Sequence, residues 1–337
     1  MTRSPYPQPL VPRIRARWER HDNRFAPVNG DEHVRVLFDG GSWLEGPLWS
    51  GAWRSVLASD IPNDQVIRWD ETTGTVGVWR APAGHANGRT MDRSGRVITC
   101  EQGTRAVTRL EHDGTLTTLA EAWEGHRLNS PNDVVERSDG TVWFTDPSYG
   151  IDSDYEGHRG RSETDGCHVY RIDHDGVVVR VADDFTKPNG LAFSADERTL
   201  YVVDTTRKLL RSFEVDRAGN LSNPRDLATC DAGSFDGVRV DELGRLWVAA
   251  HDGIHVFDPD GTLLGKLLLP EICSNLTFGG PKRNVLYITA SNLLLAIRLN
   301  LSGLHLSPYA AGRGPLMGPG LGSAHTPPAA GPMVDIP

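Results

Sequence analysis

The sequence predicts an all-β protein, a six-bladed β-propeller with four-stranded blades around a central channel. One observation is a repeated pattern in which a polar turn precedes about five β-branched or aromatic residues. The segments with this pattern are Asp92–Cys100, Arg137–Asp146, Ser194–Asp204, Asp241–Ala250 and Gly280–Ala290. The other observation is an oxygen-bearing residue that recurs every 39 to 57 residues ahead of such segments. Units of about 40–50 residues with four strands each are typical of propeller blades.

The elements follow in order from His33. HVRVLF at 33–38 alternates as a strand does, and four further short strands are expected between residues 43 and 80. The last unit, from Ser274, supplies only three strands, so Val34–Phe38 is expected to take the fourth place and close the ring. Closure removes the open sheet edges. We therefore expect a basic N-terminal surface arm at 1–30, the propeller at 31–303, and an extended or disordered Gly/Pro-rich tail at 304–337.

Composition restricts the partners and the compartment. The 337 residues carry a net charge of −9, which argues against a nucleic-acid or anionic-membrane surface. No window approaches the roughly 18 apolar residues of a membrane helix, and the first thirty residues contain no signal-peptide core. The four cysteines form no C-x-x-C pair. We expect a reduced, cytoplasmic protein with a small-molecule partner. The oligomeric state is not predicted.

The recurring polar residues predict a metal site. In a propeller the innermost strand of each blade starts at one mouth of the channel, so six starts direct six side chains at one volume. These residues are Glu45, Asn87, Asn132, Asn189, Asp236 and Asn275. Hard oxygen donors suit Ca²⁺, which takes about 6–8 oxygens, and no nitrogen or sulfur cluster favours zinc. Each Asn-Gly or Asp-Gly alone is a common turn, so the shared position carries the prediction.

Three further polar features have two interpretations each. The D-x-D-G segments at 111–116, 173–178 and 258–263 could suggest calcium loops, but the closing Glu is missing and hairpin turns are the better account. His251 follows the strand LWVAA and is either a base at an inner-strand end or a surface histidine. Glu101 follows ITC and either touches substrate or caps blade hydrogen bonds.

Several segments together resemble the senescence-marker-protein/gluconolactonase family, also called regucalcin-like. The segments are SPNDVV at 130–135, SDGTVWFTDPSYG at 138–150, KPNGLAFS at 187–194, SFDGVRVDELGRLWVA at 234–249, HVFDPDGTLLG at 255–265 and NLTFGG at 275–280. The likeness covers about 33–300. It implies a six-bladed propeller with one divalent cation, usually calcium, in the channel. Animal members carry an Arg two residues before the residue that matches Asn132, and here that residue is Ser130.

The resemblance also implies roles for individual residues. Glu45, Asn189 and Asp236 would be metal ligands, and Asn132 would be a fourth ligand or a substrate contact. Asp236 would also be the general base, with His251 as the alternative base.

The resulting hypothesis is hydrolysis of an aldonolactone with the cation as Lewis acid. Asn132 and Asn87 would orient sugar hydroxyls and Glu101 would contact substrate. Two alternatives stay open: organophosphate or phosphotriester hydrolysis at the same site, and a non-catalytic propeller that binds a small molecule. The loop Tyr149–Gly166 is long enough to overhang the channel mouth as a lid, and the alternative is that it is simply mobile.

Overall fold

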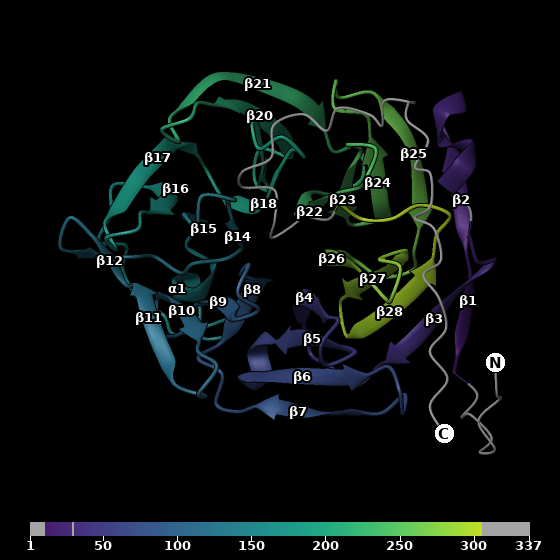
Figure 1. Ribbon diagram of the computed structural model, residues 1–337, viewed down its shortest axis with the longest axis horizontal. Coiled ribbons are helices and arrows are strands. Elements are labelled where there is room, and N and C mark those ends of the chain that lie inside the picture. Colours follow the sequence, from purple (N-terminus) through teal and green to yellow (C-terminus); the bar gives the residue numbers. More distant parts are fainter. Residues whose placement is uncertain (1–10, 29, 305–337) are drawn as a thin grey trace, which may run out of the picture.

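The computed structural model describes residues 11–28 and 30–304, and these residues form six β-sheets around a central axis (Figure 1). Blade one consists of β4 Leu44–Ser50, β5 Ser55–Asp60, β6 Gln65–Asp70 and β7 Val76–Arg80. Blade two consists of β8 Ala86–Met91, β9 Val97–Glu101, β10 Ala106–Leu110 and β11 Leu116–Ala120. Blade three consists of β14 Val134–Glu136, β15 Val142–Asp146, β16 Cys167–Ile172 and β17 Val178–Phe185. Blade four consists of β18 Pro188–Phe193, β19 Thr199–Asp204, β20 Leu209–Val215 and β21 Leu221–Thr229. Blade five consists of β22 Phe235–Val240, β23 Leu246–Ala250, β24 Gly253–Phe257 and β25 Leu263–Leu268. Blade six consists of β26 Cys273–Gly279, β27 Val285–Ala290, β28 Leu293–Arg298 and β3 His33–Phe38. The predicted fold class is confirmed.

The ring closes as the sequence predicts. β3 pairs antiparallel with β28, with Leu294 opposite Phe38 and Ala296 opposite Arg35, so the first and last parts of the propeller share one sheet. The predicted arm contributes two more strands within its described part. β1 (Arg13–Arg15) pairs with β3, and β2 (Arg17–Arg20) pairs with β25 of the neighbouring blade. Of the predicted tail, residues 305–337 lie outside the described residues.

The remaining elements within the described residues are short. The hairpin β12 (Ala122–Trp123) and β13 (His126–Arg127) follows β11. The helical turns are η1 (Asn23–Val28), η2 (Ile61–Asn63) and α1 (Tyr149–Asp152). In the described part of the chain no helix is long and apolar enough to cross a membrane.

The core lies between the blades. Side chains of a strand alternate between the two faces of its sheet, and in a propeller each face packs against a different neighbouring blade. β23 shows this alternation, because Val248 joins the cluster shared with blade four and Trp247 joins the cluster shared with blade six. Each of the six blade interfaces has such a cluster among the described residues. Strands buried on both faces explain the continuous apolar runs of the repeats.

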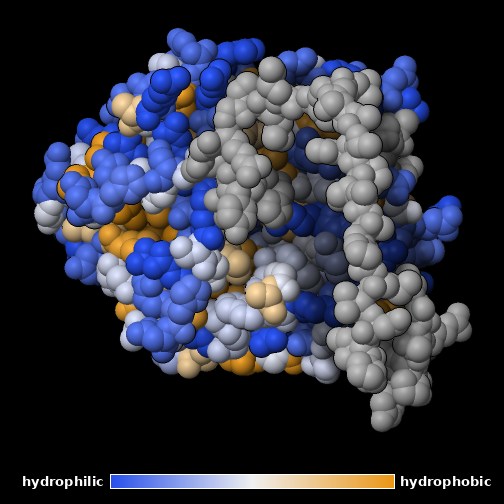
Figure 2. Space-filling model, in the orientation of Figure 1, coloured by the Kyte–Doolittle hydropathy of each residue, from blue (hydrophilic) through white to orange (hydrophobic). Residues whose placement is uncertain are grey.

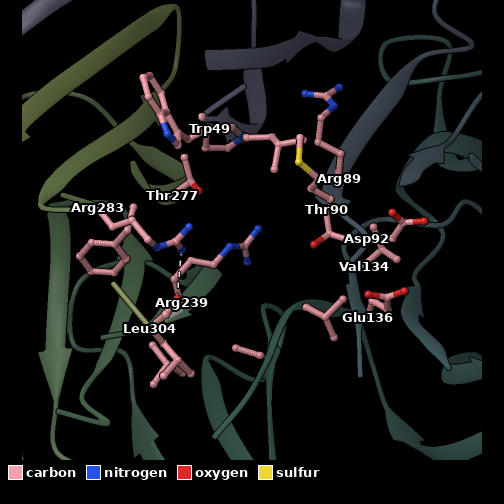
Figure 3. Close-up of a pocket in the computed structure, with 18 of the residues that line it drawn as sticks. Trp49, Arg89, Thr90, Asp92, Val134, Glu136, Arg239, Thr277, Arg283 and Leu304 are labelled. Carbon is pink, nitrogen blue, oxygen red and sulfur yellow. Dashed lines mark hydrogen bonds between the residues drawn. The ribbon is translucent and has the colours of Figure 1, made fainter. Parts of the chain in front are cut away.

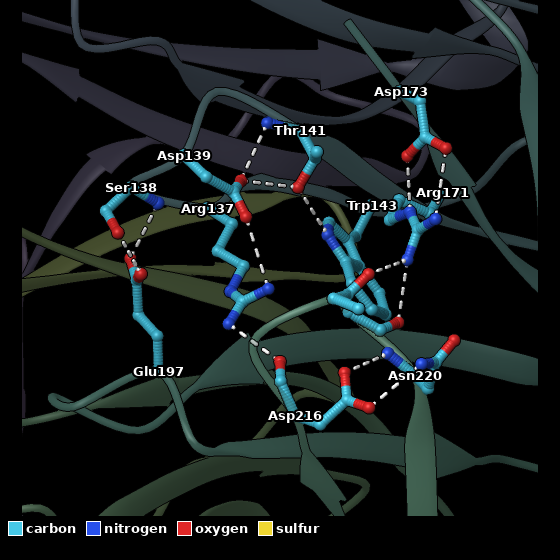
Figure 4. A network of polar contacts seen from close by, with 12 residues as sticks. Arg137, Ser138, Asp139, Thr141, Trp143, Arg171, Asp173, Glu197, Asp216 and Asn220 are labelled. Carbon is cyan, nitrogen blue, oxygen red and sulfur yellow. Dashed lines mark hydrogen bonds and ion pairs between the residues drawn. The ribbon is translucent and has the colours of Figure 1, made fainter.

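Polar contacts also join neighbouring blades, as Figure 4 shows for blades three and four. The backbone N–H of Ser138 donates to Glu197 Oε1 at 2.9 Å. In the same turn Asp139 Oδ1 accepts the N–H and the hydroxyl of Thr141 at 3.0 and 2.7 Å. The Thr141 hydroxyl in turn accepts the indole N–H of Trp143 at 2.9 Å. The polar turn of the repeat therefore orients the strand that follows it.

The D-x-D-G segments are hairpin turns. Their glycines have positive φ angles, 87° at Gly114, 81° at Gly176 and 94° at Gly261, which a residue with a Cβ rarely adopts. The aspartate before each glycine accepts the N–H two residues further on, as Asp260 does from Thr262 at 2.8 Å. The turn interpretation is confirmed over the calcium-loop alternative. Hydrophilic residues cover most of the face seen in Figure 2, with smaller hydrophobic patches between them.

Candidate functional site

Close backbone packing joins the starts of the inner strands. We call the six predicted polar residues the head ring: Glu45, Asn87, Asn132, Asn189, Asp236 and Asn275. A Cβ on Gly46 would lie 2.2 Å from the carbonyl oxygen of Asn87, and a Cβ on Gly88 would lie 2.5 Å from that of Asn132. The Gly88 N–H donates to the same Asn132 oxygen at 2.7 Å. The glycine after each of these heads therefore leaves room for the next blade.

The same arrangement continues on the other side of the ring. A Cβ on Gly190 would lie 2.7 Å from the carbonyl oxygen of Asp236, and one on Gly237 would lie 2.3 Å from Asn275 Oδ1. Asn275 Nδ2 then donates to Glu45 Oε2 at 3.0 Å, which connects the last blade to the first. Glu45 is 3% exposed. Five of the six head-ring residues therefore approach either another head-ring residue or the glycine that follows one. The sixth, Asn189, directly precedes Gly190.

Unpaired oxygen atoms mark a ligand position at the head ring. Asn87 Oδ1, Asn189 Oδ1 and Asp236 Oδ1 are buried and have no hydrogen-bond partner among the described residues. A buried acceptor without a donor costs about 1–3 kcal/mol. The Asn189 amide is oriented by its Nδ2, which donates to Thr205 Oγ1 at 3.0 Å, and this leaves its oxygen for another partner. Two carboxylates and several amide oxygens fit a divalent cation with oxygen ligands, as Ca²⁺ requires.

Electrostatics favour a cation at the same place. Burial raises the pKa of Glu45, and hydrogen bonds from Gly46 and Asn275 lower it in part. The negative charges of Asp133 and Glu156 raise the pKa further. Burial also holds the pKa of Asp236 well above its usual range, with added repulsion from Glu45, Glu156 and Asp133. Carboxylates that repel one another in a buried site are stabilised by a shared positive charge.

The described chain matches the family model described as SMP-30/gluconolactonase/LRE-like region over residues 43–292. The protein belongs to this family. The prediction made from the sequence motifs is therefore confirmed. A gluconolactonase of Zymomonas mobilis is 29% identical over 305 residues, which cover 80% of this chain and 82% of that protein. The pentonolactonase XacC of Haloferax volcanii is 27% identical over 258 residues, covering 73% of this chain and 81% of that protein.

Solved structures agree with the family assignment. A gluconolactonase structure from Xanthomonas campestris is 38% identical, with a TM-score of 0.81, and covers 86% of this chain and 98% of that one. A calcium-binding regucalcin from Agrobacterium tumefaciens is 20% identical, with a TM-score of 0.67, and covers 80% of this chain and 97% of that one. At this lower identity the likeness supports the fold alone.

Two residues of the loop Tyr149–Gly166, Tyr149 and Glu156, approach the head ring, and neither was predicted from the sequence as a site residue. The carboxylate of Glu156 is close enough to raise the pKa of Glu45 and of Asp236, and burial raises its own pKa to about 7. Burial raises the pKa of the Tyr149 hydroxyl, and the nearby side chains of Thr205 and Asn189 oppose that rise. The length of the loop was the only signal in the sequence, since neither residue belongs to a repeat.

The loop is held at both sides. Lys187 Nζ donates to Ser148 Oγ at 2.6 Å and lies 4.5 Å from the centre of the Tyr149 ring. On the blade-two side, the His158 ring meets the His85 ring edge-on at a centroid distance of 5.0 Å. These contacts anchor the loop to blades two and four beside the head ring, and its role as a lid stays a prediction.

A buried ion pair lies beneath the head ring. Arg239 on β22 donates to Asp133 Oδ2 at 2.9 Å, and Asp133 is fully buried. These residues belong to blades five and three, so the pair reaches past blade four. Arg89 on β8 is also buried, and it donates to the carbonyl oxygen of Gly46 at 2.7 Å. The head ring, with its carboxylates Glu45 and Asp236, is therefore followed along the channel by two arginines, Arg89 and Arg239.

The remaining predicted residues lie beside the head ring. Glu101 is buried, and its carboxylate accepts from Arg80 at 2.8 Å and from the hydroxyls of Thr104 and Thr108 at 2.9 Å each. The bond from Arg80 connects blade one to blade two, and the substrate role of Glu101 stays a prediction. His251 is exposed at the end of β23, where its ring packs against Gly233. Its role as a base also stays a prediction.

A second cluster of acids does not need a metal. Asp231, Asp252 and His255 have ligand atoms within 4.8 Å of one another. However, Lys266 Nζ lies 2.6 Å from Asp231 Oδ1 and 3.3 Å from Asp252 Oδ2. The ammonium group supplies the positive charge that this cluster requires. The head ring differs from it, because no lysine or arginine of the described residues forms an ion pair with Glu45 or Asp236.

Proposed function

We propose that this protein hydrolyses a sugar lactone of the aldonolactone class at the head ring. Its family and its gluconolactonase and pentonolactonase relatives support this reaction. The observation that supports the proposal is that Asp236 lies near Glu45 and Asn189, while Asn189 Oδ1 and Asp236 Oδ1 have no hydrogen-bond donor among the described residues. Buried oxygens without a donor support a ligand at this position, and measured turnover separates a catalytic propeller from one that only binds that ligand.

The head ring would hold one divalent cation, with Ca²⁺ favoured by its oxygen donors. Glu45, Asn189 and Asp236 would be the ligands, and Asn132 would be a fourth ligand or would contact substrate. When bound, such a cation supplies Lewis acidity that stabilises negative charge on the lactone carbonyl oxygen.

The residues of the chain would carry the proton chemistry. Asp236 accepts a proton from the attacking water as the water oxygen bonds to the carbonyl carbon. The ring C–O bond then breaks, and the ring oxygen takes that proton and leaves as a hydroxyl, giving the open hydroxy acid. Asn132 and Asn87 orient the sugar hydroxyls, and Glu101 contacts the substrate. His251 is the alternative base.

The test is turnover of glucono-1,5-lactone by the purified protein, corrected for spontaneous hydrolysis. We expect EDTA to abolish turnover and Ca²⁺ to restore it, and we expect Asp236→Asn to lower kcat by about 10²–10⁴-fold. Asp231→Asn is the matched control, because it removes an acid from the lysine-neutralised cluster and should leave kcat near the wild-type value. Full turnover in EDTA would remove the cation from the reaction.

Two comparisons separate the alternatives. If His251→Asn keeps kcat while Asp236→Asn loses it with Ca²⁺ still bound at saturation, Asp236 is the base. A loss with His251→Asn alone would assign the proton transfer to the histidine. Hydrolysis of paraoxon faster than of any lactone would instead favour the phosphotriesterase alternative.

A further inference from the structure

The opposite mouth of the channel contains a cavity of about 940 Å³, which is a typical size for a ligand pocket. It is lined by the later residues of the same inner strands that begin at the head ring. Leu48 and Trp49 follow Glu45 on β4, and Phe278 follows Asn275 on β26. Two to four residues of a strand span about 7–13 Å, so the cavity is separate from the head ring. Arg89 and Arg239 line the cavity on the side of the head ring.

The charges that line this cavity are not balanced by contacts. Most of the ionic side chains have a partner: Arg54 pairs with Glu71, Arg93 with Glu197, Asp92 with Arg96 and Arg239 with Asp133. Among the described residues, Arg89 and Arg283 make no ion pair within 4.0 Å, and Glu136 is the one lining acid without one. Even with Glu136 ionised, these two unpaired arginines outnumber the one unpaired acid. A surplus of positive charge remains.

Arg283 is held in place by its backbone. Its N–H donates to the Gly280 carbonyl at 2.9 Å, and its own carbonyl accepts the N–H of Gly303 at 2.9 Å. One terminal nitrogen of its guanidinium donates to the Leu304 carbonyl at 3.0 Å, while its Nε is buried without a partner among the described residues. Burial alone lowers the pKa of Arg283, which agrees with the lack of an acid beside it.

The side chains of this cavity form two distinct sides. Figure 3 shows the guanidinium groups of Arg239 and Arg283 pointing into the centre of the cavity, with Asp92 and Glu136 on the opposite side of the view. The Trp49 ring is fixed by stacking on Tyr287, with ring centroids 5.5 Å apart. The cationic groups thus stand beside a rigid aromatic wall.

We propose that this cavity binds an organic anion whose carboxylate or phosphate lies on Arg283 and Arg239 and whose apolar body packs against Trp49 and Phe278. Arginine suits this role because its planar group presents paired N–H donors to two oxygens of one anion. The bonds of Arg239 to Asp133 and to the Val238 carbonyl use its terminal nitrogens and hold it in position. The proposal does not depend on lactone hydrolysis, because the head ring lies at the other end of the channel.

The test is calorimetric titration of the full chain with 3-phenylpropionate, phenyl phosphate, 3-phenylpropanol and inorganic phosphate. We expect at least one of the two aromatic anions to bind with a Kd below 1 mM. The neutral alcohol and inorganic phosphate should bind at least about tenfold more weakly, because each lacks one of the two contacts. Preference for phenylpropionate or for phenyl phosphate distinguishes a carboxylate ligand from a phosphate ester.

Arg283→Gln should raise the Kd of the preferred anion by about tenfold or more. Circular dichroism would show that the variant is folded. Arg217→Gln removes an exposed arginine elsewhere on the surface and should leave the affinity unchanged. Failure of both aromatic anions to bind the wild-type chain at millimolar concentration would overturn the proposal. Equal affinities of the wild type and a folded Arg283→Gln variant would do so as well.

Discussion

Replacement of Gly190 by alanine tests the close packing that builds the head ring. The added Cβ would lie 2.6 Å from the nitrogen of Val238 and 2.7 Å from both the carbonyl oxygen of Asp236 and the Cα of Gly237. Carbon contacts prefer about 3.5–4.0 Å, so β18 and β22 must separate by about 0.8 Å or more. All three atoms are backbone, and no side chain can rotate away to relieve the contact.

The expected loss of stability in Gly190→Ala comes from the close contact alone and not from backbone strain. Gly190 does not have a positive φ, so alanine can adopt its backbone conformation and only the contact is penalised. Such overpacking costs about 1–3 kcal/mol, which corresponds to a Tm about 3–9 °C lower. Because the shift also moves Asn189 relative to Asp236, we expect Ca²⁺ affinity to fall by about 10–100-fold.

The matched control is Gly77→Ala on the outer strand β7. Gly77 also lacks a positive φ, and a Cβ there would meet no atom within 4 Å. Differential scanning calorimetry and calcium titration would be run on both variants. If Gly190→Ala has the Tm and the Ca²⁺ affinity of Gly77→Ala, the packing of glycines does not set the positions of the heads and the reasoning is wrong.

Three other perturbations follow from the contacts. Phe25→Ala should lower the unfolding free energy by about 3 kcal/mol, because the Phe25 ring is 2% exposed and packs on Trp18 of the N-terminal strand β2; urea denaturation measures it. Arg239→Gln should cost about 3–5 kcal/mol by leaving Asp133 buried without its partner, and adding Asp133→Asn should recover part of that loss. Burial lowers the pKa of His255 below 6.5 despite its bond to an aspartate. The unfolded chain therefore binds more protons below about pH 6.5, and stability should fall with acid by up to about 1.4 kcal/mol per pH unit, less so in His255→Gln.

Each of these expectations has an outcome that contradicts it. Wild-type stability in Phe25→Ala would mean that the N-terminal strands do not reinforce the propeller. Additive effects of the Arg239 and Asp133 substitutions would show that the two side chains are not coupled. Equal pH slopes of the wild type and His255→Gln between pH 7 and 5 would assign the acid sensitivity to other groups. The groups beside His255 are Asp231, Asp252 and Lys266.

Much of the fold was predictable because its signals are local. Turn residues, short apolar strands and their repetition are properties of neighbouring residues, and they gave the blades and the closing role of β3. The positions of the head-ring residues were also predictable, because each lies within the first residues of an inner strand or just before it, at the same place in its unit. The two strands of the N-terminal segment were not predicted, although Ile14, Ala16 and Trp18 alternate with charged residues. The run is short, and the sheet edges with which it pairs are supplied by residues far along the chain.

The amino-acid sequence by itself determined the six-fold repetition, the family, and the oxygen donors at the strand starts. Only the tertiary structure decided that Glu156 and Tyr149 approach these donors, that Arg239 reaches Asp133 from a non-adjacent blade, and that Lys266 neutralises the second acidic cluster. The physical reason is that a periodic pattern specifies the position of a residue within its blade. Contacts across the channel depend on the curvature and closure of the whole ring, which no local pattern encodes.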